Sequence, residues 1–145
     1  MTLVVCVASD AAFGAPAATV RKPAVAGMFY PAAPGQLSEM IRTLTQKARQ
    51  TPFTPPGDRP LKALVMPHAG YIYSGWTAAH AVLVLKPGRF SKVIVMAPDH
   101  RVGFREGAIS DVSYYQTPLG RVPLHSDADI LRERMDCFRA VPESD

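Results

Sequence analysis

Two short apolar runs constrain the fold most strongly. The first is Leu61–Met66 and the second is Lys92–Ala97, and each is followed closely by a proline and a histidine. Continuous apolar runs of this length are typical of strands that are covered on both faces of a sheet. A helical pattern lies between the two runs. The sequence therefore predicts a strand–helix–strand unit with parallel strands and a right-handed crossover.

The carboxyl ends of these two strands are the expected place for a functional site. His68 follows the first run and His100 follows the second. Open α/β sheets bind their ligands at the carboxyl ends of the strands, so adjacent parallel strands would bring both imidazoles to one crevice. Imidazole is the commonest metal ligand, and a facial site for non-haem iron uses two histidines and a carboxylate. Two interpretations stay open: a shared metal site, or two histidines that each cap a helix or bond a backbone carbonyl.

The other two histidines are expected to have structural surroundings. His80 lies on an amphipathic helix, where it packs or faces solvent, and His125 is expected to be a solvated loop residue before a helix. The chain contains no GxSxG nucleophile elbow, which argues against a Ser-His-Asp triad. It also contains no GxGxxG or GxxxxGK[ST] loop to hold a phosphate.

The periodicity of the remaining chain predicts three helices and a further strand. Apolar residues at three- and four-residue steps predict a helix over Gln36–Gln50. Ser74 is predicted to be the N-cap of a second helix, and Ser126–Met135 resembles a capping box followed by a short third helix. The segment Ala108–Tyr115 alternates loosely and is predicted to be a strand. The expected fold class is α/β.

Length and composition exclude several classes of protein. At 145 residues the chain is expected to form one domain at most. The net charge is +4 and the basic residues are dispersed, which argues against a nucleic-acid-binding arm. No apolar run approaches the roughly 18 residues of a membrane span. Two cysteines without metal-ligand spacing, Cys6 and Cys137, are expected to be reduced thiols.

The first twenty residues differ from the rest of the chain. An apolar run over Leu3–Ala8 is followed by an Ala-rich stretch, which fits a signal peptide, a strand covering a sheet edge or a loose extension. No basic residue precedes the run and Asp10 ends it early, whereas signal peptides carry an apolar region of about 7–15 residues. We therefore expect an N-terminal extension over residues 1–20, a main domain over 21–145, and a cytoplasmic rather than an exported protein.

Four motifs, taken in order, resemble the Memo family, which in prokaryotes is also called AmmeMemoRadiSam system protein B. They are RKPAVAGMFYP at 21–31, PHAGYIYSG at 67–75, APDH at 97–100 and YQTPLG at 115–120. The resemblance extends from Arg21 to about Phe138, and the order of the four motifs is more specific than any one of them.

The resemblance implies a fold, a metal and partners. The Memo fold is similar to that of the class III extradiol (LigB-like) dioxygenases, a central, mostly parallel sheet flanked by helices. The family's metal-binding histidines fall on His68 and His100. Family members are connected with iron or copper redox chemistry, and the bacterial ones with a radical SAM protein and an AMMECR1-like protein. Animal relatives are connected with binding of phosphotyrosine peptides.

The chain departs from the family pattern in two ways. Asp99 stands where the second metal motif usually has serine, and its carboxylate could orient a water, add a ligand or face solvent. Family members are also longer, and their usual third ligand lies in the part that is missing here; Cys137 does not match its motif. We therefore expect a fragment, a frameshifted gene or an incomplete chain with an incomplete sheet. Such a chain is expected to self-associate or to be only marginally stable, and to retain little iron.

Two functions consequently stay open. The first is a metal-dependent redox or oxygenase-like protein in which His68 and His100 hold iron or copper. Its expected substrate-binding residues are Tyr30, Tyr71, Tyr73 and Asp99. The alternative is a non-catalytic adaptor that captures a peptide or phosphopeptide in the same crevice.

Overall fold

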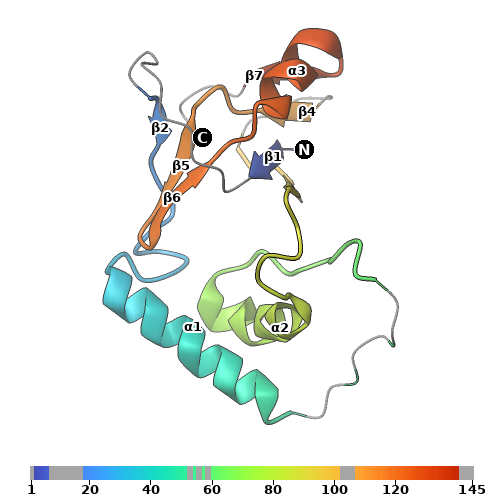
Figure 1. The fold of residues 1–145 in the computed structure, drawn as a ribbon. Helices are drawn as coiled ribbons and strands as arrows, with labels where there is room; N and C mark the ends of the chain where they lie inside the picture. Colours follow the sequence, from blue (N-terminus) through green and yellow to red (C-terminus); the bar gives the residue numbers. More distant parts are fainter. Residues whose placement is uncertain are drawn as a thin grey trace. The chain divides into compact units, whose positions relative to one another are not determined.

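The computed structural model describes the backbone of residues 2–6 and the residues 18–51, 54, 57, 60–101 and 107–140. The chain divides into two compact units (Figure 1). The helical unit is Val25–Arg89, and the sheet unit combines Met1–Ala24 with Phe90–Asp145. No helix in the described part of the chain has the length and hydropathy to cross a bilayer.

The first helix of the helical unit, α1, spans Pro34–Arg49. Pro34 occupies its first turn, where a missing N–H costs nothing, after an extended residue at the N-cap. Lys47 and Arg49 lie in the last turn, where positive charge is favourable to the helix dipole. Leu37 and Ala48 are buried. The predicted helix over Gln36–Gln50 is confirmed, with its start two residues earlier.

The second helix, α2, spans Tyr71–Val84 and begins earlier than the sequence predicted. Its N-cap is Gly70, whose carbonyl accepts the backbone N–H groups of Tyr73 and Ser74 at 2.9 and 3.1 Å. The prediction that Ser74 is the N-cap is wrong. Ser74 lies in the first turn, and its hydroxyl donates to the carbonyl of Ala69 at 2.8 Å instead of to solvent. A serine is tolerated inside the helix because that carbonyl satisfies it.

The two helices pack side by side, and one aromatic side chain joins them (Figure 1). The Lys47 ammonium lies 5.0 Å from the ring centroid of Trp76, a cation–π contact from α1 to α2. The His80 ring lies edge-on at 5.5 Å from the same indole. The Nδ1 atom of His80 is 2.9 Å from the carbonyl of Trp76, which can only accept, so Nδ1 carries the proton. His80 therefore packs on its helix, as predicted.

A four-stranded sheet forms the larger part of the sheet unit, in the order β3-β1-β4-β7. The strands are β1 (Thr2–Cys6), β3 (Val93–Ala97), β4 (Gly107–Ile109) and β7 (Phe138–Ala140). Strand β1 pairs with β3 in antiparallel fashion along its whole length and with β4 in parallel, and β4 and β7 are also parallel. The sheet is therefore mixed.

A small core forms where helix α3 (Asp127–Arg134) meets this sheet. Ile109 and Ala128 are buried together, with Leu131 and Phe138 packed against them. The Arg132 guanidinium donates to the carbonyl of Ser110 at 2.5 Å, which ties α3 to the residue after β4.

The start of α3 also differs from the capping that the sequence predicted. The predicted third helix is confirmed, but the Ser126 side chain makes no cap hydrogen bond. The neighbouring His125 takes this role, because its Nδ1 atom lies 3.1 Å from the backbone nitrogen of Asp127. His125 is half-buried, so the prediction of a solvated loop residue is wrong.

A second sheet contains β2 (Val20–Arg21), β5 (Tyr114–Thr117) and β6 (Gly120–Pro123). Strands β5 and β6 form a hairpin (orange in Figure 1), and β2 runs parallel to β5. The Arg21 guanidinium lies 5.5 Å from the ring centroid of Tyr115, which adds a cation–π contact to this pairing. The predicted strand over Ala108–Tyr115 is thus two shorter strands in two sheets.

The α/β composition predicted from the sequence is confirmed, but the predicted strand–helix–strand unit is wrong. Leu61–Met66 is not a strand, and its Val65 side chain is fully exposed. The second predicted strand exists as β3, but its strand neighbour among the described residues is the antiparallel β1. The first residues of the chain are themselves a short apolar, β-branched run, and they take the place beside β3. A single, mostly parallel central sheet is not confirmed.

We predict that Gly107→Ala lowers the free energy of unfolding by about 1–3 kcal/mol, the usual cost of overpacking. A Cβ atom at Gly107 would lie 2.4 Å from the Phe138 ring, which packs against the buried core. Gly35→Ala is the matched control, since nothing lies within 4 Å of its Cβ position in α1. That control should be neutral or stabilising by about 0.4–1 kcal/mol. Equal loss of stability in both variants, measured by denaturant unfolding, would contradict the packing of Phe138 on Gly107.

Candidate functional site

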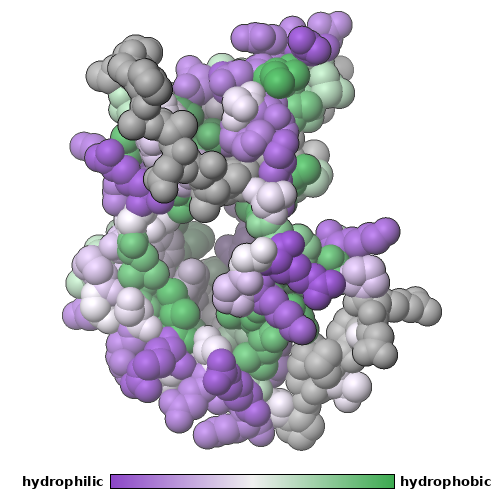
Figure 2. Space-filling view, in the orientation of Figure 1, coloured by the Kyte–Doolittle hydropathy of each residue, from purple (hydrophilic) through white to green (hydrophobic). Residues whose placement is uncertain are grey.

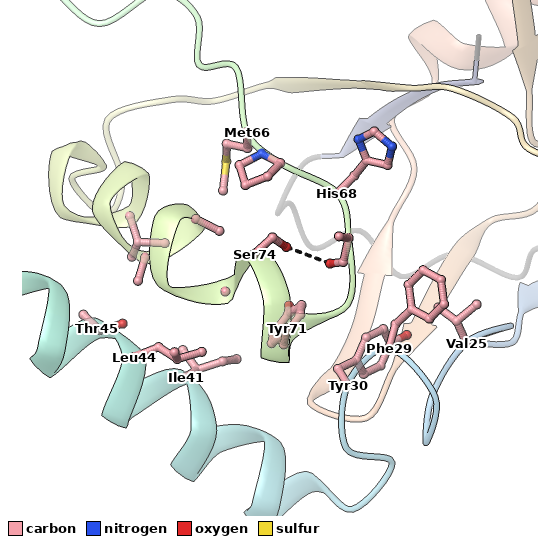
Figure 3. A pocket seen from close by; sticks show the side chains of 16 residues that line it. Val25, Phe29, Tyr30, Ile41, Leu44, Thr45, Met66, His68, Tyr71 and Ser74 are labelled. Carbon is pink, nitrogen blue, oxygen red and sulfur yellow. Dashed lines mark hydrogen bonds between the residues drawn. The ribbon is translucent and has the colours of Figure 1, made fainter.

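The helical unit contains a pocket of about 360 Å³ between α1, α2 and two loop segments (Figure 3). Its walls are mostly apolar, and hydrophobic surface is visible between the two helices in Figure 2. The lining residues are Val25, Phe29, Tyr30, Ile41, Leu44, Thr45, Met66, Pro67, His68, Ala69, Tyr71, Ser74, Gly75, Ala78, Ala79 and Val82. A pocket of this size and lining is typical of sites for small molecules or for single side chains of a larger partner.

One hydrogen bond joins the two loop segments that shape the mouth of the pocket. The turn Val25–Tyr30 closes on itself, with the backbone N–H of Phe29 donating to the carbonyl of Val25 at 2.9 Å. The carbonyl of Phe29 then accepts the backbone N–H of Tyr71, at the start of α2, at 2.8 Å. The turn packs closely against the start of α2, since a Cβ atom at Gly70 would lie in van der Waals contact, 3.4 Å from the Phe29 carbonyl oxygen.

The polar groups of the pocket gather near this junction. The rings of Tyr30 and Tyr71 lie 5.6 Å apart, tilted by 49°. Burial raises the pKa of Tyr30, and the neighbouring Tyr71 raises it further. The Tyr30 phenol therefore stays protonated at neutral pH and can donate a hydrogen bond. The Ser74 hydroxyl already donates to Ala69 (dashed in Figure 3) and can still accept.

The structure brings together three of the six predicted site residues. His68, Tyr30 and Tyr71 all line the pocket. Tyr73 is 82% exposed and is not among the lining residues, although it follows in the same helix. His100 and Asp99 belong to the sheet unit, directly after β3.

Asp99 has a structural role within its own loop. Its Oδ1 atom accepts the backbone N–H of Arg101 at 2.8 Å. One carboxylate oxygen therefore stabilises the turn that carries His100.

The described residues offer part of a metal-ligand set. His68 and His100 have exposed imidazoles, the donor type that iron, copper and zinc accept in proteins. Within the described part of the chain, however, no three His, Cys, Asp or Glu side chains converge to hold an ion. Cys137, which did not match the family's ligand motif, is an exposed free thiol on the sheet unit. The histidines fit a transition metal in donor chemistry, and further ligands would have to complete the site.

Comparison with known proteins decides the family. A family model described as Memo-like protein matches residues 21–141, a span that includes His68 and His100. The chain belongs to the Memo-like family. Residues 1–20 precede the match, so the Memo-like part of the chain begins at Arg21, as the motifs indicated.

Three curated relatives show how much of such a protein is present. A MEMO1 family protein of Thermotoga neapolitana is 40% identical over 115 residues, which cover 75% of this chain and 42% of the relative. One from Nitrosopumilus maritimus is 33% identical over 109 residues, 75% of this chain and 40% of the relative. Protein MEMO1 of Xenopus laevis is 34% identical over 113 residues, which cover 78% of this chain and 35% of the relative. The Memo-like chain therefore spans about two fifths of the length of these relatives.

Sequence reasoning missed most of the apolar wall of the pocket. The periodicity that predicts a helix over Gln36–Gln50 does not indicate that Ile41 and Leu44 line a cavity, and the motif at 21–31 does not indicate that Phe29 joins them. The available signal was the coincidence of two features, an apolar helical stripe and an aromatic turn just before it. Neither reveals by itself how far α1 and α2 stand apart.

We predict that Ser74→Ala loosens the loop that carries His68. The substitution removes the hydroxyl that donates to Ala69 and leaves that carbonyl without this donor. The expected loss is about 0.5–1.5 kcal/mol in the free energy of unfolding, with faster amide exchange over residues 68–71. Thr77→Ala is the control, because Thr77 is exposed on the same helix. Unchanged exchange in Ser74→Ala, or an equal change in Thr77→Ala, would contradict this role.

We also predict that Tyr30 makes stability fall at high pH. Because the pKa of Tyr30 is raised in the folded state, the unfolded chain releases this proton first. The contribution of the neutral Tyr30 phenol to the free energy of unfolding is fully present below the unfolded-state pKa of about 10. It is lost as pH rises through the higher folded-state pKa. Tyr30→Phe should flatten this part of the pH–stability curve, and should remove a step above the ordinary tyrosine range from a phenolate absorbance titration. Tyr114→Phe is the control; a curve changed equally by both variants would contradict the assignment.

Proposed function

We propose that this Memo-like protein contributes part of a metal-dependent redox site, with His68 and His100 as nitrogen ligands for iron or copper. The observation that carries the proposal is the position of His68. It lies within the PHAGYIYSG motif and lines the pocket beside Tyr30 and Tyr71. An imidazole at the rim of an apolar pocket is well placed to hold an ion next to a bound molecule.

The bound metal would supply redox or Lewis-acid chemistry, and the chain's own residues would prepare its surroundings. The apolar walls exclude water from a molecule in the pocket. Tyr30, whose pKa burial raises, is a neutral phenol that can donate a hydrogen bond to that molecule. Asp99 holds the loop of His100 by accepting the backbone N–H of Arg101.

The remaining parts of such a site would come from the portion of the family protein outside this match. We infer that residues 21–145 are the N-terminal part of a larger Memo-like α/β domain with a LigB-like sheet. The further metal ligands would then lie in the part of the relatives that the matched residues do not reach. The proposed setting is cytoplasmic, beside a radical SAM protein and an AMMECR1-like protein.

A non-catalytic adaptor is the second candidate, and one observation favours it. Large apolar side chains are exposed around the pocket, including Phe29 at 48% and Met66 at 41%. Exposed apolar residues around a concave site are typical of surfaces that bind a peptide. A peptide or phosphopeptide would place one side chain in the pocket and others on this rim.

We predict that His68→Ala and His100→Ala each remove most of the bound metal from the complete family domain, because each takes away one nitrogen ligand. Metal content is measured by elemental analysis after dialysis, together with oxygen consumption. His80→Ala is the matched control, since His80 is fixed by the Trp76 carbonyl and indole. Equal metal loss in the His80 and His68 variants would show that the wrong pair was chosen.

The same variants separate the two candidate functions. Peptide binding that persists in the presence of a chelator and in His100→Ala would favour the adaptor. Metal-dependent oxygen consumption that is lost in both ligand variants would favour the redox protein.

A further inference from the structure

The first turn of α3 is capped by a titratable ring. The first backbone N–H groups of a helix have no partner within the helix and must find one elsewhere. In α3 the N–H of Ala128 donates to the backbone carbonyl of His125 at 2.9 Å. The N–H of Asp127 donates instead to a side-chain atom, Nδ1 of the same histidine, at 3.1 Å. Because histidine ordinarily titrates between about pH 5 and 8, this cap can respond to pH.

The capping hydrogen bond requires a neutral imidazole. A backbone N–H can only donate, so Nδ1 of His125 is the unprotonated nitrogen and the neutral ring carries its proton on Nε2. Protonation of Nδ1 would place two donors, the ring N–H and the N–H of Asp127, against each other. The cap is therefore lost when the ring becomes an imidazolium.

A carboxylate oxygen lies beside the same ring nitrogen. Oδ1 of Asp127 is 3.1 Å from Nδ1 of His125, within ion-pairing distance of a protonated ring. The other oxygen, Oδ2, accepts from the Lys92 ammonium at 2.6 Å, a contact between α3 and the residue before β3. The hydrogen bond from Lys92, with the neighbouring His125, holds the pKa of Asp127 below its ordinary value. The carboxylate is therefore ionised throughout the range in which histidine titrates.

Other charged groups near α3 have different positions or partners. Asp129, in the same first turn, is paired with Arg132. Two strands pack against α3: β1 contains no charged residue, and β7 contains one, the exposed Arg139. The partner that the structure provides for a protonated His125 is therefore the carboxylate of Asp127.

We propose that His125 is a pH-dependent cap of α3 that exchanges one group of Asp127 for another. The neutral ring accepts the backbone N–H of Asp127. In mild acid the imidazolium releases that N–H and donates to Oδ1 of the same residue. The ring stays beside α3, Lys92 keeps Oδ2, and the first backbone N–H of the helix loses its partner. Neither proposed metal ligand takes part, so the exchange is independent of the proposed function.

The loosened turn is the one that closes the core of the sheet unit. Ala128, the residue after Asp127, is 2% exposed and is buried together with Ile109. Its own N–H keeps the carbonyl of His125 in both states, because a backbone carbonyl does not titrate in this range. Acid is therefore expected to weaken the start of α3 without removing the helix from the core.

The test follows the His125 ring and the Asp127 amide by NMR in the unchanged chain, between about pH 5 and 8. At the neutral end the ring nitrogens should show the tautomer with the proton on Nε2. Protection of the Asp127 amide from hydrogen exchange should fall about two- to tenfold as the ring takes up its proton, with one midpoint for both signals. A proton on Nδ1 at the neutral end, or protection that stays constant while the ring titrates, would overturn the proposal.

Two substitutions separate capping from titration. His125→Asn keeps a side-chain oxygen that can accept the Asp127 N–H but does not titrate, so protection of that amide should no longer depend on pH. His125→Ala removes the acceptor, so the amide should be unprotected by this contact at every pH. Protection that still varies with pH in His125→Asn would assign the response to another group and would contradict the proposal.

His80→Asn is the matched control. His80 is also a histidine whose Nδ1 contacts a backbone group, but that group is the carbonyl of Trp76 in α2. The pH response of the Asp127 amide should persist unchanged in this variant. Loss of the response in His80→Asn would place its origin in the helical unit and would overturn the assignment to His125.

Discussion

The hydrogen bond from the backbone N–H of Tyr71 to the carbonyl of Phe29 determines the arrangement of the candidate site. It connects an aromatic turn near the start of the Memo-like match with the first residue of α2. Because it joins two backbone groups, it does not require the chemistry of any particular side chain. The pocket, the tyrosine pair and the loop of His68 all lie around this junction. The chemistry proposed for the site therefore rests on a contact between two segments that are distant in the sequence.

Local structure followed the sequence where one pattern dominated. The helix over Pro34–Arg49 was predictable because apolar residues recur at helical spacing and prolines lie at its borders. The caps were less predictable. Ser74 lies inside α2, whose N-cap is Gly70, and Ser126 is the N-cap residue of α3 but makes no side-chain cap hydrogen bond. At α3 the His125 ring accepts the backbone N–H of Asp127 instead. Strand pairing was the least predictable, because Thr2–Cys6 and Leu61–Met66 are similar short apolar runs and periodicity does not decide which one lies beside β3.

Some residues of the candidate site were likewise predictable from the sequence, and others were not. The family motifs indicated His68, Tyr30 and Tyr71 as candidate site residues, and all three line the pocket. Residues within one short motif, such as PHAGYIYSG, are close in sequence and therefore also close in space. The apolar walls from α1 were not predictable, because packing between helices is a tertiary property. His100 and Asp99 lie in the loop after β3 in the sheet unit, and the described residues contain an incomplete set of metal ligands. An apolar pocket with one histidine suits both proposed functions, and the complete ligand set is what separates a redox centre from a peptide-binding surface.

The position of Trp76 has a practical consequence. It is the sole tryptophan of the chain, and it lies in the helical unit between the Lys47 ammonium and the His80 ring. Indole emission therefore reports on the contact between α1 and α2, whereas the sheet unit contributes tyrosines but no indole. Emission from Trp76 and far-ultraviolet dichroism of the whole chain would monitor different parts of the molecule. Coincident transitions would indicate that the two units unfold as one cooperative body, and separate transitions that each has a stability of its own.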